Sequence, residues 1–391
     1  MKILVIGAGM YVTGRNGTGV GTILASLAES ARHLPIEEVV VISHNPSGEK
    51  DVQMARRRIG EKIETPLKVR FQNLKTDSES EFADFLHRNN FSAGVVCVPD
   101  HLHFFYTKSL LENRIPALVV KPLTPTLPEA KELVRLSLER GVYGAVEFHK
   151  RFDETNLYTR EALSQGLLGQ ILYFSIDYSQ RITIPTETFR GWCEKTNIFQ
   201  YLGVHYVDLI FFFTNFIPSR AMAIGTRGIL HQKGIKTWDS VHAQIIWKDP
   251  ANRKTEFVSQ FAINWIDPTC TSALSDQKFK VIGTKGRLEC DQKNRGIELV
   301  TEGRGIQHPN PYFSDFLDDG SGTTRFGGYG HKSIDRFFRD VLDLEQNNVS
   351  LQFLDEHRPN FRQSLVSIAA IDAVTASLND EFAWKEIADV F

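Results

Sequence analysis

Short runs of β-branched and apolar residues alternate with longer amphipathic stretches along the first 150 residues. Several runs are apolar at every position, which is typical of parallel strands covered by helices on both faces. Strands that alternate with helices predict βαβ units and a doubly wound parallel sheet of the α/β class. The predicted strands are Ile3–Ile6, Val39–Ile42, Val69–Phe71, Gly94–Val98, Ala117–Val120 and Tyr143–Val146, and the predicted helices are Thr22–His33, Asp51–Gly60, Ser80–Arg88, Phe104–Asn113 and Leu127–Arg140.

The pattern changes after about residue 152, where strand-like segments follow one another without intervening helices. This succession favours antiparallel pairing, and the segment 283–286 has the composition of a tight turn. The predicted strands are Gln170–Arg181, Ser240–Trp247, Thr255–Asn264, Phe279–Ile282 and Ile297–Val300, and the predicted helices are Phe199–Phe213, Ser333–Glu345 and Phe361–Leu378.

The change of pattern predicts two domains, residues 1–150 and residues 151–391, with an α+β fold for the second. The last helix of the second domain is a candidate to pack back on the first. Residues 303–330 are dense in Gly, Asp, Pro and Ser, and we expect a long surface loop there.

Composition narrows the possible partners. A net charge of -2 provides no basic field for nucleic acid or anionic lipid. The four cysteines show no metal-ligand spacing, so we expect no metal site and a reducing compartment. The N-terminus lacks the features of a signal peptide, and the apolar stretch Leu209–Ile217 is far shorter than the roughly 20 residues that span a bilayer. We therefore expect a cytoplasmic protein with no membrane segment.

Glycines follow the first predicted strand at Gly7 and Gly9. A glycine-rich turn in this place lets the backbone approach a dinucleotide pyrophosphate, with Met10 and Tyr11 beside it. Val12 occupies the third glycine position of the GxGxxG pattern, and further glycines follow before the helix near Thr22. The turn thus carries an insertion, and we expect residues 10–21 to form an extended loop. The alternative is a flexible loop without a ligand.

The end of the second predicted strand bears on the choice of dinucleotide. It reads Ser43, His44, Asn45, with no carboxylate until Glu49. A carboxylate in this place usually binds the ribose hydroxyls of NAD. Small polar groups followed by the arginines at 56–58 would suit the 2′-phosphate of NADP, although these arginines can equally form a solvated helix face. The cofactor is therefore expected to be NAD or NADP.

Three local motifs carry candidate chemistry. They are Val98–His103 with Pro99 and His103, Val119–Pro122 with Lys121, and Gly203–Asp208 with His205 and Asp208. His205 and Asp208 are three residues apart on a predicted helix, so the carboxylate can orient the imidazole. Taken alone, a histidine in such an apolar helix is more often structural.

Together these motifs resemble the Gfo/Idh/MocA family, named after glucose–fructose oxidoreductase and inositol dehydrogenase. That family has a Pro-x-x-x-His turn after strand four, a Glu-Lys-Pro motif after strand five and a Gly-x-His-x-x-Asp helix. The first and third occur here intact and in order. In the second, Val120 replaces the glutamate. The segments 147–151 and 283–286 also resemble recurring parts of the family.

The resemblance implies a Rossmann domain followed by a domain with a large open antiparallel sheet, which often forms a homodimer or homotetramer interface. It also implies hydride transfer between a nicotinamide and a secondary alcohol carbon of a sugar, inositol or nucleotide sugar. By the same resemblance Lys121 hydrogen-bonds the reacting hydroxyl, His205 acts as general acid/base and Asp208 positions His205 or substrate. Pro99, His103 and Pro122 would lie near the nicotinamide. Imidazole suits this chemistry because it titrates near neutral pH.

Three further residues are candidates for binding a carbohydrate-type substrate. Arg151 follows the sixth strand, and either substrate binding or an ion pair at the domain junction would explain it. Tyr178 and Trp192 are candidates for a sugar pocket, with the surface of the sheet or a subunit interface as the alternative. Two rival functions also remain open. One is an enzyme that uses tightly bound NAD transiently for lyase, hydrolase or isomerase chemistry, and the other is a non-catalytic dinucleotide sensor.

Overall fold

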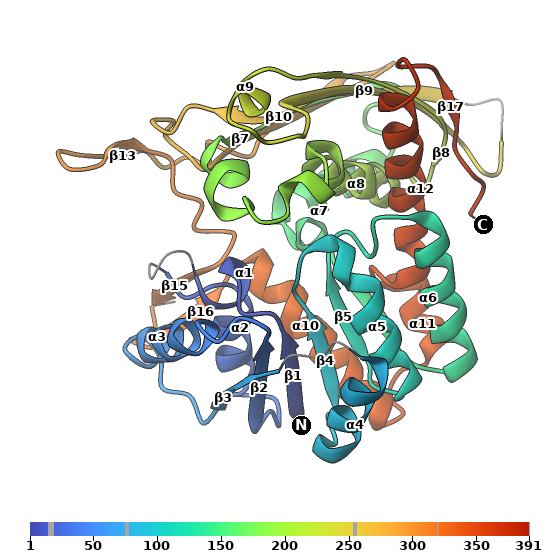
Figure 1. Cartoon of the computed structure of the whole chain (residues 1–391). Coiled ribbons are helices and arrows are strands. Elements are labelled where there is room, and N and C mark those ends of the chain that lie inside the picture. Colours follow the sequence, from blue (N-terminus) through green and yellow to red (C-terminus); the bar gives the residue numbers. More distant parts are fainter. Residues whose placement is uncertain (15–18, 75–77, 253–255, 319, 391) are drawn as a thin grey trace. The chain divides into compact units, whose positions relative to one another are not determined.

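The computed structural model describes residues 1–14, 19–74, 78–252, 256–318 and 320–390, and its chain divides into two compact units (Figure 1). Gly17, one of the glycines before the helix near Thr22, and Thr255, the first residue of a predicted strand, lie outside the described residues. The first unit comprises Met1–Thr124, Pro128–Asp153 and Pro311–Ser364, and the second comprises Pro125–Leu127, Glu154–Asn310 and Leu365–Phe391.

The first unit is built on a six-stranded sheet in the order β3-β2-β1-β4-β5-β6. Every neighbouring pair is parallel, which confirms the predicted doubly wound sheet. The strand order reverses between β1 and β4, and ligands of such sheets bind at the carboxyl ends of the strands near this point. The strands are β1 Lys2–Ile6, β2 Glu38–Ser43, β3 Lys68–Asn73, β4 Ala93–Val96, β5 Ala117–Val120 and β6 Gly144–Glu147.

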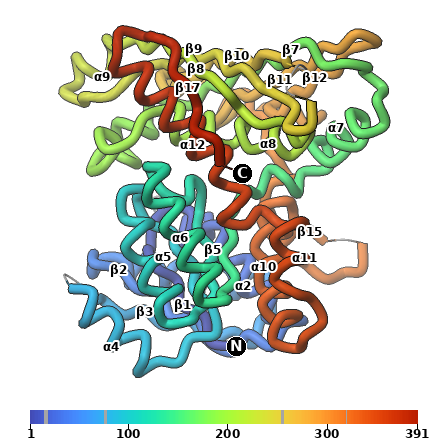
Figure 2. The backbone as a smooth tube through the Cα atoms, turned by 90° about the vertical axis from the view of Figure 1, so that its right-hand side faces the viewer, coloured from blue at the N-terminus to red at the C-terminus, as the bar shows by residue number. Residues whose placement is uncertain are grey.

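Helices cover both faces of this sheet. Ile3 and Val5 of β1 belong to a core shared with α2 and α10. Gly94 of β4 faces the other way and contacts Leu110 of α5. Figure 2 shows α5 and α6 on one side and α2 and α10 on the other. The helices before residue 150 are α1 Met10–Thr13, α2 Ile23–Ser30, α3 Gly48–Gly60, α4 Glu79–Asn89, α5 His103–Glu112 and α6 Leu127–Arg140.

The late segment 311–364 packs on the first unit, whereas the sequence grouped it with the second domain. The prediction of a long surface loop over 303–330 is wrong, because this stretch holds three short strands and Phe326 is buried beside α2. The Phe326 amide donates a hydrogen bond to Glu29. The elements are β13 Leu299–Thr301, β14 Gly305–Gln307, β15 Asp315–Asp318, β16 Thr324–Gly327, α10 Tyr329–Glu345 and α11 Leu351–His357.

A buried ion pair fixes α10 to the chain after α11. Arg358 donates from Nε and Nη2 to the two oxygens of Asp340, at 2.7 and 3.1 Å. Replacing Arg358 by Met leaves the buried carboxylate without its cation, so we expect the free energy of unfolding to fall by about 3 kcal/mol in urea denaturation. The matched control is Arg57→Met, which removes the exposed pair with Glu61 and should cost less than about 0.5 kcal/mol. Equal losses in the two variants would contradict this expectation.

The second unit contains a seven-stranded open sheet in the order β12-β11-β7-β10-β9-β8-β17. Neighbouring strands are antiparallel, as predicted, except for the parallel pair β7 and β10. This exception arises because β8, β9 and β10 form a meander that returns to the edge of β7. The strands are β7 Ile171–Arg181, β8 Ile217–Thr226, β9 Ser240–Lys248, β10 Glu256–Asp267, β11 Ser275–Gly283, β12 Arg287–Asp291 and β17 Lys385–Glu386.

One face of this sheet is buried beneath helices. Along β10, Phe261 and Trp265 are buried, while Gln260, which projects to the opposite face, is exposed. This alternation is expected for a sheet that is covered on one face only. Figure 1 shows α7 (Glu154–Ser164) and α8 (Val204–Thr214) on the same side of the sheet, and α12 (Phe361–Leu378) bonds to β8 through Ser377. In the part of the chain that the structure describes, no helix combines the length and apolarity needed to cross a membrane.

Candidate functional site

The glycine turn after β1 lies at the carboxyl end of the first sheet. Gly7 has φ +108°, and a Cβ there would lie 2.0 Å from the carbonyl oxygen of Cys97, so only glycine fits. Gly9 caps the N-terminus of α1, and a Cβ on it would meet nothing within 4 Å. One glycine therefore lets the turn pack on β4, and the other leaves its backbone open to a ligand, as a pyrophosphate-binding turn needs.

The insertion behind this turn differs from the expected extended loop. Residues Met10–Thr13 form a helical turn, α1, and the Thr22 amide donates to the Tyr11 carbonyl at 2.8 Å. Gly21 has φ +69°, and a Cβ on it would lie 2.4 Å from the Val12 backbone. The expectation is wrong because this backbone approach folds the insertion back onto α1. Residues 15–18 lie outside the described part of the chain.

The turn after β2 is stabilised by its own side chains. Ser43 Oγ accepts from the Asn45 amide at 3.1 Å, and Asn45 Oδ1 accepts from the Ser47 amide at 3.0 Å. His44 Nε2 lies 2.9 Å from the Tyr106 hydroxyl. Arg58 reaches from α3 to the Gly19 carbonyl at 3.1 Å. The first three contacts form a small polar turn, which is compatible with either dinucleotide.

His103 joins the loops after β4 and β5. The residue is buried, its Nδ1 lies 2.7 Å from the Pro122 carbonyl and its Nε2 lies 2.9 Å from the Val98 carbonyl. Both ring nitrogens are therefore occupied by backbone oxygens. This arrangement fixes Pro99 and Lys121, which lie on the two joined loops, and the Lys121–Pro122 peptide bond is cis.

Lys121 lies directly after β5 and is half-buried. Burial lowers its pKa to about 8, while the negative charges of Asp100 and Glu147 oppose that shift. An amine with such a pKa exchanges its proton near neutral pH. Of the sequence-predicted catalytic residues, Lys121 thus has the environment that proton-sharing chemistry requires.

A buried acid, Glu147, lies at the end of β6 and was not among the predicted site residues. Its Oε2 accepts from His149 Nδ1 at 2.9 Å, and its Oε1 accepts from the Ser333 hydroxyl at 2.6 Å. The His149 ring stacks on Tyr329 with centroids 5.8 Å apart and lies 6.4 Å from Tyr11. The sequence did contain a signal for this residue, because Glu147 ends an otherwise apolar strand.

Arg151, a predicted substrate ligand, is buried in the first unit. Its Nη1 donates to Gln363 Oε1 at 2.6 Å, and its guanidinium lies over the Phe148 ring at 5.7 Å. Both contacts are internal to the fold. They suit a structural arginine, so the substrate role of Arg151 stays a prediction without geometric support.

His205 and Asp208 both lie in the first half of α8, in the second unit, and both are buried. A turn of π-helix, Phe199–Gly203, precedes α8. The neighbouring Tyr206 faces the sheet, where its hydroxyl lies 3.2 Å from Gln277 and 2.9 Å from Gln292. This anchored turn fixes the orientation of the helix that carries His205.

The two aromatic candidates of the second unit differ in exposure. Tyr178 is buried edge-on against Tyr206, and burial raises its pKa to about 12, so it stays neutral. Trp192 is half-buried, with its ring centroid 4.4 Å from that of Phe189. Of the two, Trp192 is the less buried, and part of its ring is open to a sugar.

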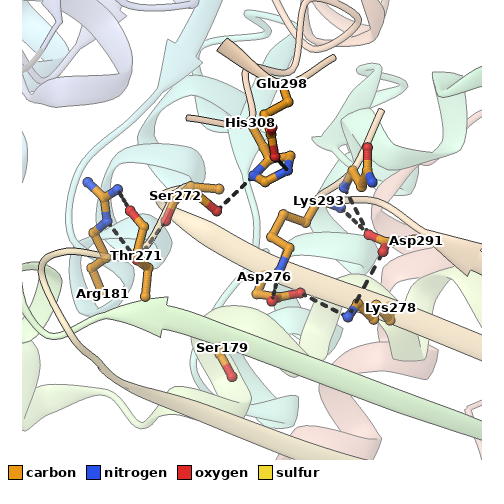
Figure 3. A network of polar contacts seen from close by, with 12 residues as sticks. Ser179, Arg181, Thr271, Ser272, Asp276, Lys278, Asp291, Lys293, Glu298 and His308 are labelled. Carbon is orange, nitrogen blue, oxygen red and sulfur yellow. Dashed lines mark hydrogen bonds and ion pairs between the residues drawn. The ribbon is translucent and has the colours of Figure 1, made fainter. Parts of the chain in front are cut away.

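A polar network at the ends of β7, β11 and β12 is shown in Figure 3. Arg181 donates to Thr271 Oγ1 at 2.9 Å, His308 contacts Ser272, and Lys293 bonds to Asp276. These contacts fasten loops to the sheet. Among the described residues, no group of three or more His, Cys, Asp or Glu side chains is arranged to hold a metal ion.

Comparisons with known proteins bear on the family and the fold of this chain. Residues 1–148 match the model of an oxidoreductase family with an NAD-binding Rossmann fold, GFO_IDH_MocA, and residues 157–289 match the GFO/IDH/MocA C-terminal domain. The chain is 35% identical to uncharacterized oxidoreductase YhhX of Escherichia coli over 34% of its length and 37% of that protein. It is 22% identical to 2,7-anhydro-N-acetylneuraminate hydratase of Mediterraneibacter gnavus, over 60% of each chain.

A similar fold occurs in scyllo-inositol dehydrogenase from Lactobacillus casei, solved with NAD(H) and scyllo-inositol. The TM-score is 0.68 at 16% identity, and the match covers 99% of both chains. At this identity the likeness concerns the fold alone. The two relatives by sequence are matched over only part of their own lengths.

Proposed function

Because this chain belongs to the Gfo/Idh/MocA oxidoreductase family, we propose that it is an NAD(P)-dependent oxidoreductase acting on a secondary alcohol of a sugar, inositol or nucleotide sugar. The observation that carries the proposal is a half-buried lysine, Lys121, with a pKa of about 8, at the carboxyl edge of a parallel sheet whose first turn fits a dinucleotide. A homo-oligomer formed through the open sheet belongs to the same proposal.

The residues of the first unit fit a nicotinamide dinucleotide. Gly7 lets the turn pack closely, and Gly9 leaves the backbone next to α1 open. Met10 and Tyr11 begin α1, where amides favour an anion. The turn 43–45 would hold the adenosine end, and the loops tied by His103 would border the nicotinamide. When bound, the nicotinamide accepts or donates the hydride.

Lys121 would act on the substrate hydroxyl. As an ammonium it donates a hydrogen bond that stabilises a developing alkoxide, and as a neutral amine it accepts the hydroxyl proton. A pKa of about 8 makes both forms accessible. We therefore assign to Lys121 the polarisation of the reacting hydroxyl.

The assignment of His205 as general acid/base is supported by the family motif and by its anchored position in α8. An imidazole exchanges protons near neutral pH, which alcohol oxidation requires. Asp208 lies one helical turn further along α8, where a carboxylate can orient a histidine or a substrate. Trp192 and Tyr178 remain the candidates for the sugar side of the site.

A panel of sugars, inositols and nucleotide sugars tests the function with NAD and with NADP. With at least one secondary alcohol, we expect the absorbance of reduced nicotinamide, at about 340 nm, to rise. We also expect a preference for one of the two cofactors. Calorimetric titration of both cofactors provides the control, because binding without turnover would point to a dinucleotide sensor. Absence of both binding and turnover would contradict the proposal.

A second candidate function is supported by the similarity to the hydratase. An enzyme of this kind would oxidise and then re-reduce one substrate carbon, so that no reduced nicotinamide accumulates. We expect such a chain to retain dinucleotide on purification. Substrate conversion followed by mass spectrometry, without any change in absorbance, would favour this candidate over the dehydrogenase.

A further inference from the structure

The carboxylate that the family motif places before its lysine is absent at Val120, and another carboxylate stands beside that position. β5 and β6 pair in parallel, and Val120 is the direct partner of Glu147. Paired residues of neighbouring strands project to the same face of a sheet. Glu147 therefore extends from the sheet on the same side as residue 120, one strand away.

Glu147 is held in a fixed position. It is 2% exposed, and each of its oxygens accepts one hydrogen bond, from His149 and from Ser333. A buried carboxylate is costly unless it is hydrogen-bonded and near a cation. The two donors supply the hydrogen bonds, and the negative charge of Glu147 raises the pKa of Lys121 against the effect of burial.

We propose that Glu147 is a positioning residue for Lys121 and takes, from the neighbouring strand, the place of the carboxylate missing at position 120. The inference rests on the proposed function, in which Lys121 acts on the reacting hydroxyl. The negative charge of Glu147 favours the ammonium form of Lys121 and holds it near the end of β5. His149 and Ser333 act through Glu147 by keeping its oxygens in place.

Glu147 is not the only charge that acts on Lys121. Asp100, in the turn after β4, also favours the ammonium form of Lys121, and its effect is larger than that of Glu147. Burial raises the pKa of Cys97 to about 12 and that of Tyr11 well above its usual value, so both are neutral near pH 7. The titratable groups that face the pair are Asp100 and Cys97 after β4, Tyr11 in α1, His149 after β6 and Tyr329 in α10.

The test measures the pH at which the Lys121 amine loses its proton in the cofactor-free protein. Reactivity with acetic anhydride, read by mass spectrometry of the Lys121 peptide, should show a midpoint near pH 8 in the natural chain. In Glu147→Gln, removal of the negative charge destabilises the ammonium, so we expect the midpoint to fall by about one pH unit or more. The Lys121-dependent limb of the activity profile should move the same way.

Two further variants separate positioning from general structural damage. Glu139→Gln makes the same charge change at an exposed site on α6, where Glu139 pairs with Arg135, and should leave the midpoint unchanged. The double variant Val120→Glu with Glu147→Val returns the carboxylate to position 120 and should restore the midpoint toward that of the natural chain. Thermal unfolding identifies variants that remain folded.

The results distinguish failure of the role proposed for Glu147 from failure of the proposed oxidoreductase function. An unchanged midpoint in folded Glu147→Gln would overturn the inference, and so would a shift that the relocated carboxylate fails to reverse. A shift with rescue supports it. If the shift and rescue occur in a protein that neither binds dinucleotide nor turns over any substrate, the electrostatic effect of Glu147 on Lys121 stands while the proposed function fails.

Discussion

Replacing Lys121 by Met is expected to reduce kcat/KM for the alcohol about a thousand-fold, once a substrate is identified. Methionine keeps the length of the side chain but can neither donate to an alkoxide nor take up a proton. Because the pKa of Lys121 is about 8, the natural enzyme should gain oxidation activity as the pH rises toward 8 and lose reduction activity above it. In Lys121→Met, both the rise of oxidation activity and the fall of reduction activity with pH should disappear.

The matched control is Lys108→Met in the same unit. Lys108 forms an ion pair with Glu112 on α5 at 3.0 Å, and its loss should change kcat/KM by less than about two-fold. Dinucleotide affinity, measured by calorimetry, shows whether Lys121→Met retains the cofactor site. A variant that binds dinucleotide and keeps most of its turnover would remove Lys121 from the mechanism.

Gly7→Ala should impair both folding and dinucleotide binding. The new Cβ would lie 2.0 Å from the Cys97 carbonyl oxygen, and the φ of +108° is strained for alanine. The contact is with backbone at the end of β4, which cannot move without disturbing the sheet. We expect the free energy of unfolding to fall by about 3 kcal/mol, measured by urea denaturation, because overpacking and backbone strain add.

Gly9→Ala provides the comparison. Its φ is -77°, and its Cβ would point into open space, so we expect a change in stability below about 1 kcal/mol. If the dinucleotide approaches this backbone, the added methyl should still weaken binding. A stable Gly9→Ala with unaltered affinity would argue against phosphate binding at this turn, and equal stability of the two variants would contradict the assigned role of Gly7.

The elements of the first sheet were largely predictable because buried parallel strands carry continuous apolar runs. The strand at 117–120 and the helix at 127–140 have the predicted bounds. β8, by contrast, was missed, since Pro218 and Arg220 interrupt its alternation. The segment 303–330 was misread as a loop because its buried phenylalanine is surrounded by glycine and aspartate. Burial there depends on α2, far away in the chain.

Part of the candidate site could likewise be predicted from the sequence, and part of it could not. Gly7 and Lys121 could be located from the sequence, because each follows a recognisable strand within a few residues. Glu147 could not be paired with Lys121, because that requires the register of β5 against β6. Its partner Ser333 lies 186 residues further along the chain. The roles of Lys121, His205 and Asp208 in turnover remain predictions.

The first unit draws on two distant stretches of chain, which has a consequence for its synthesis. On the ribosome, residues 1–153 emerge long before 311–364. The face of β1 that carries Ile3 and Val5 therefore stays incompletely covered until α10 has been synthesised. Contacts of such high sequence separation form late and slowly. A nascent chain released before residue 364 would expose this apolar face, and it would depend on chaperones to stay in solution.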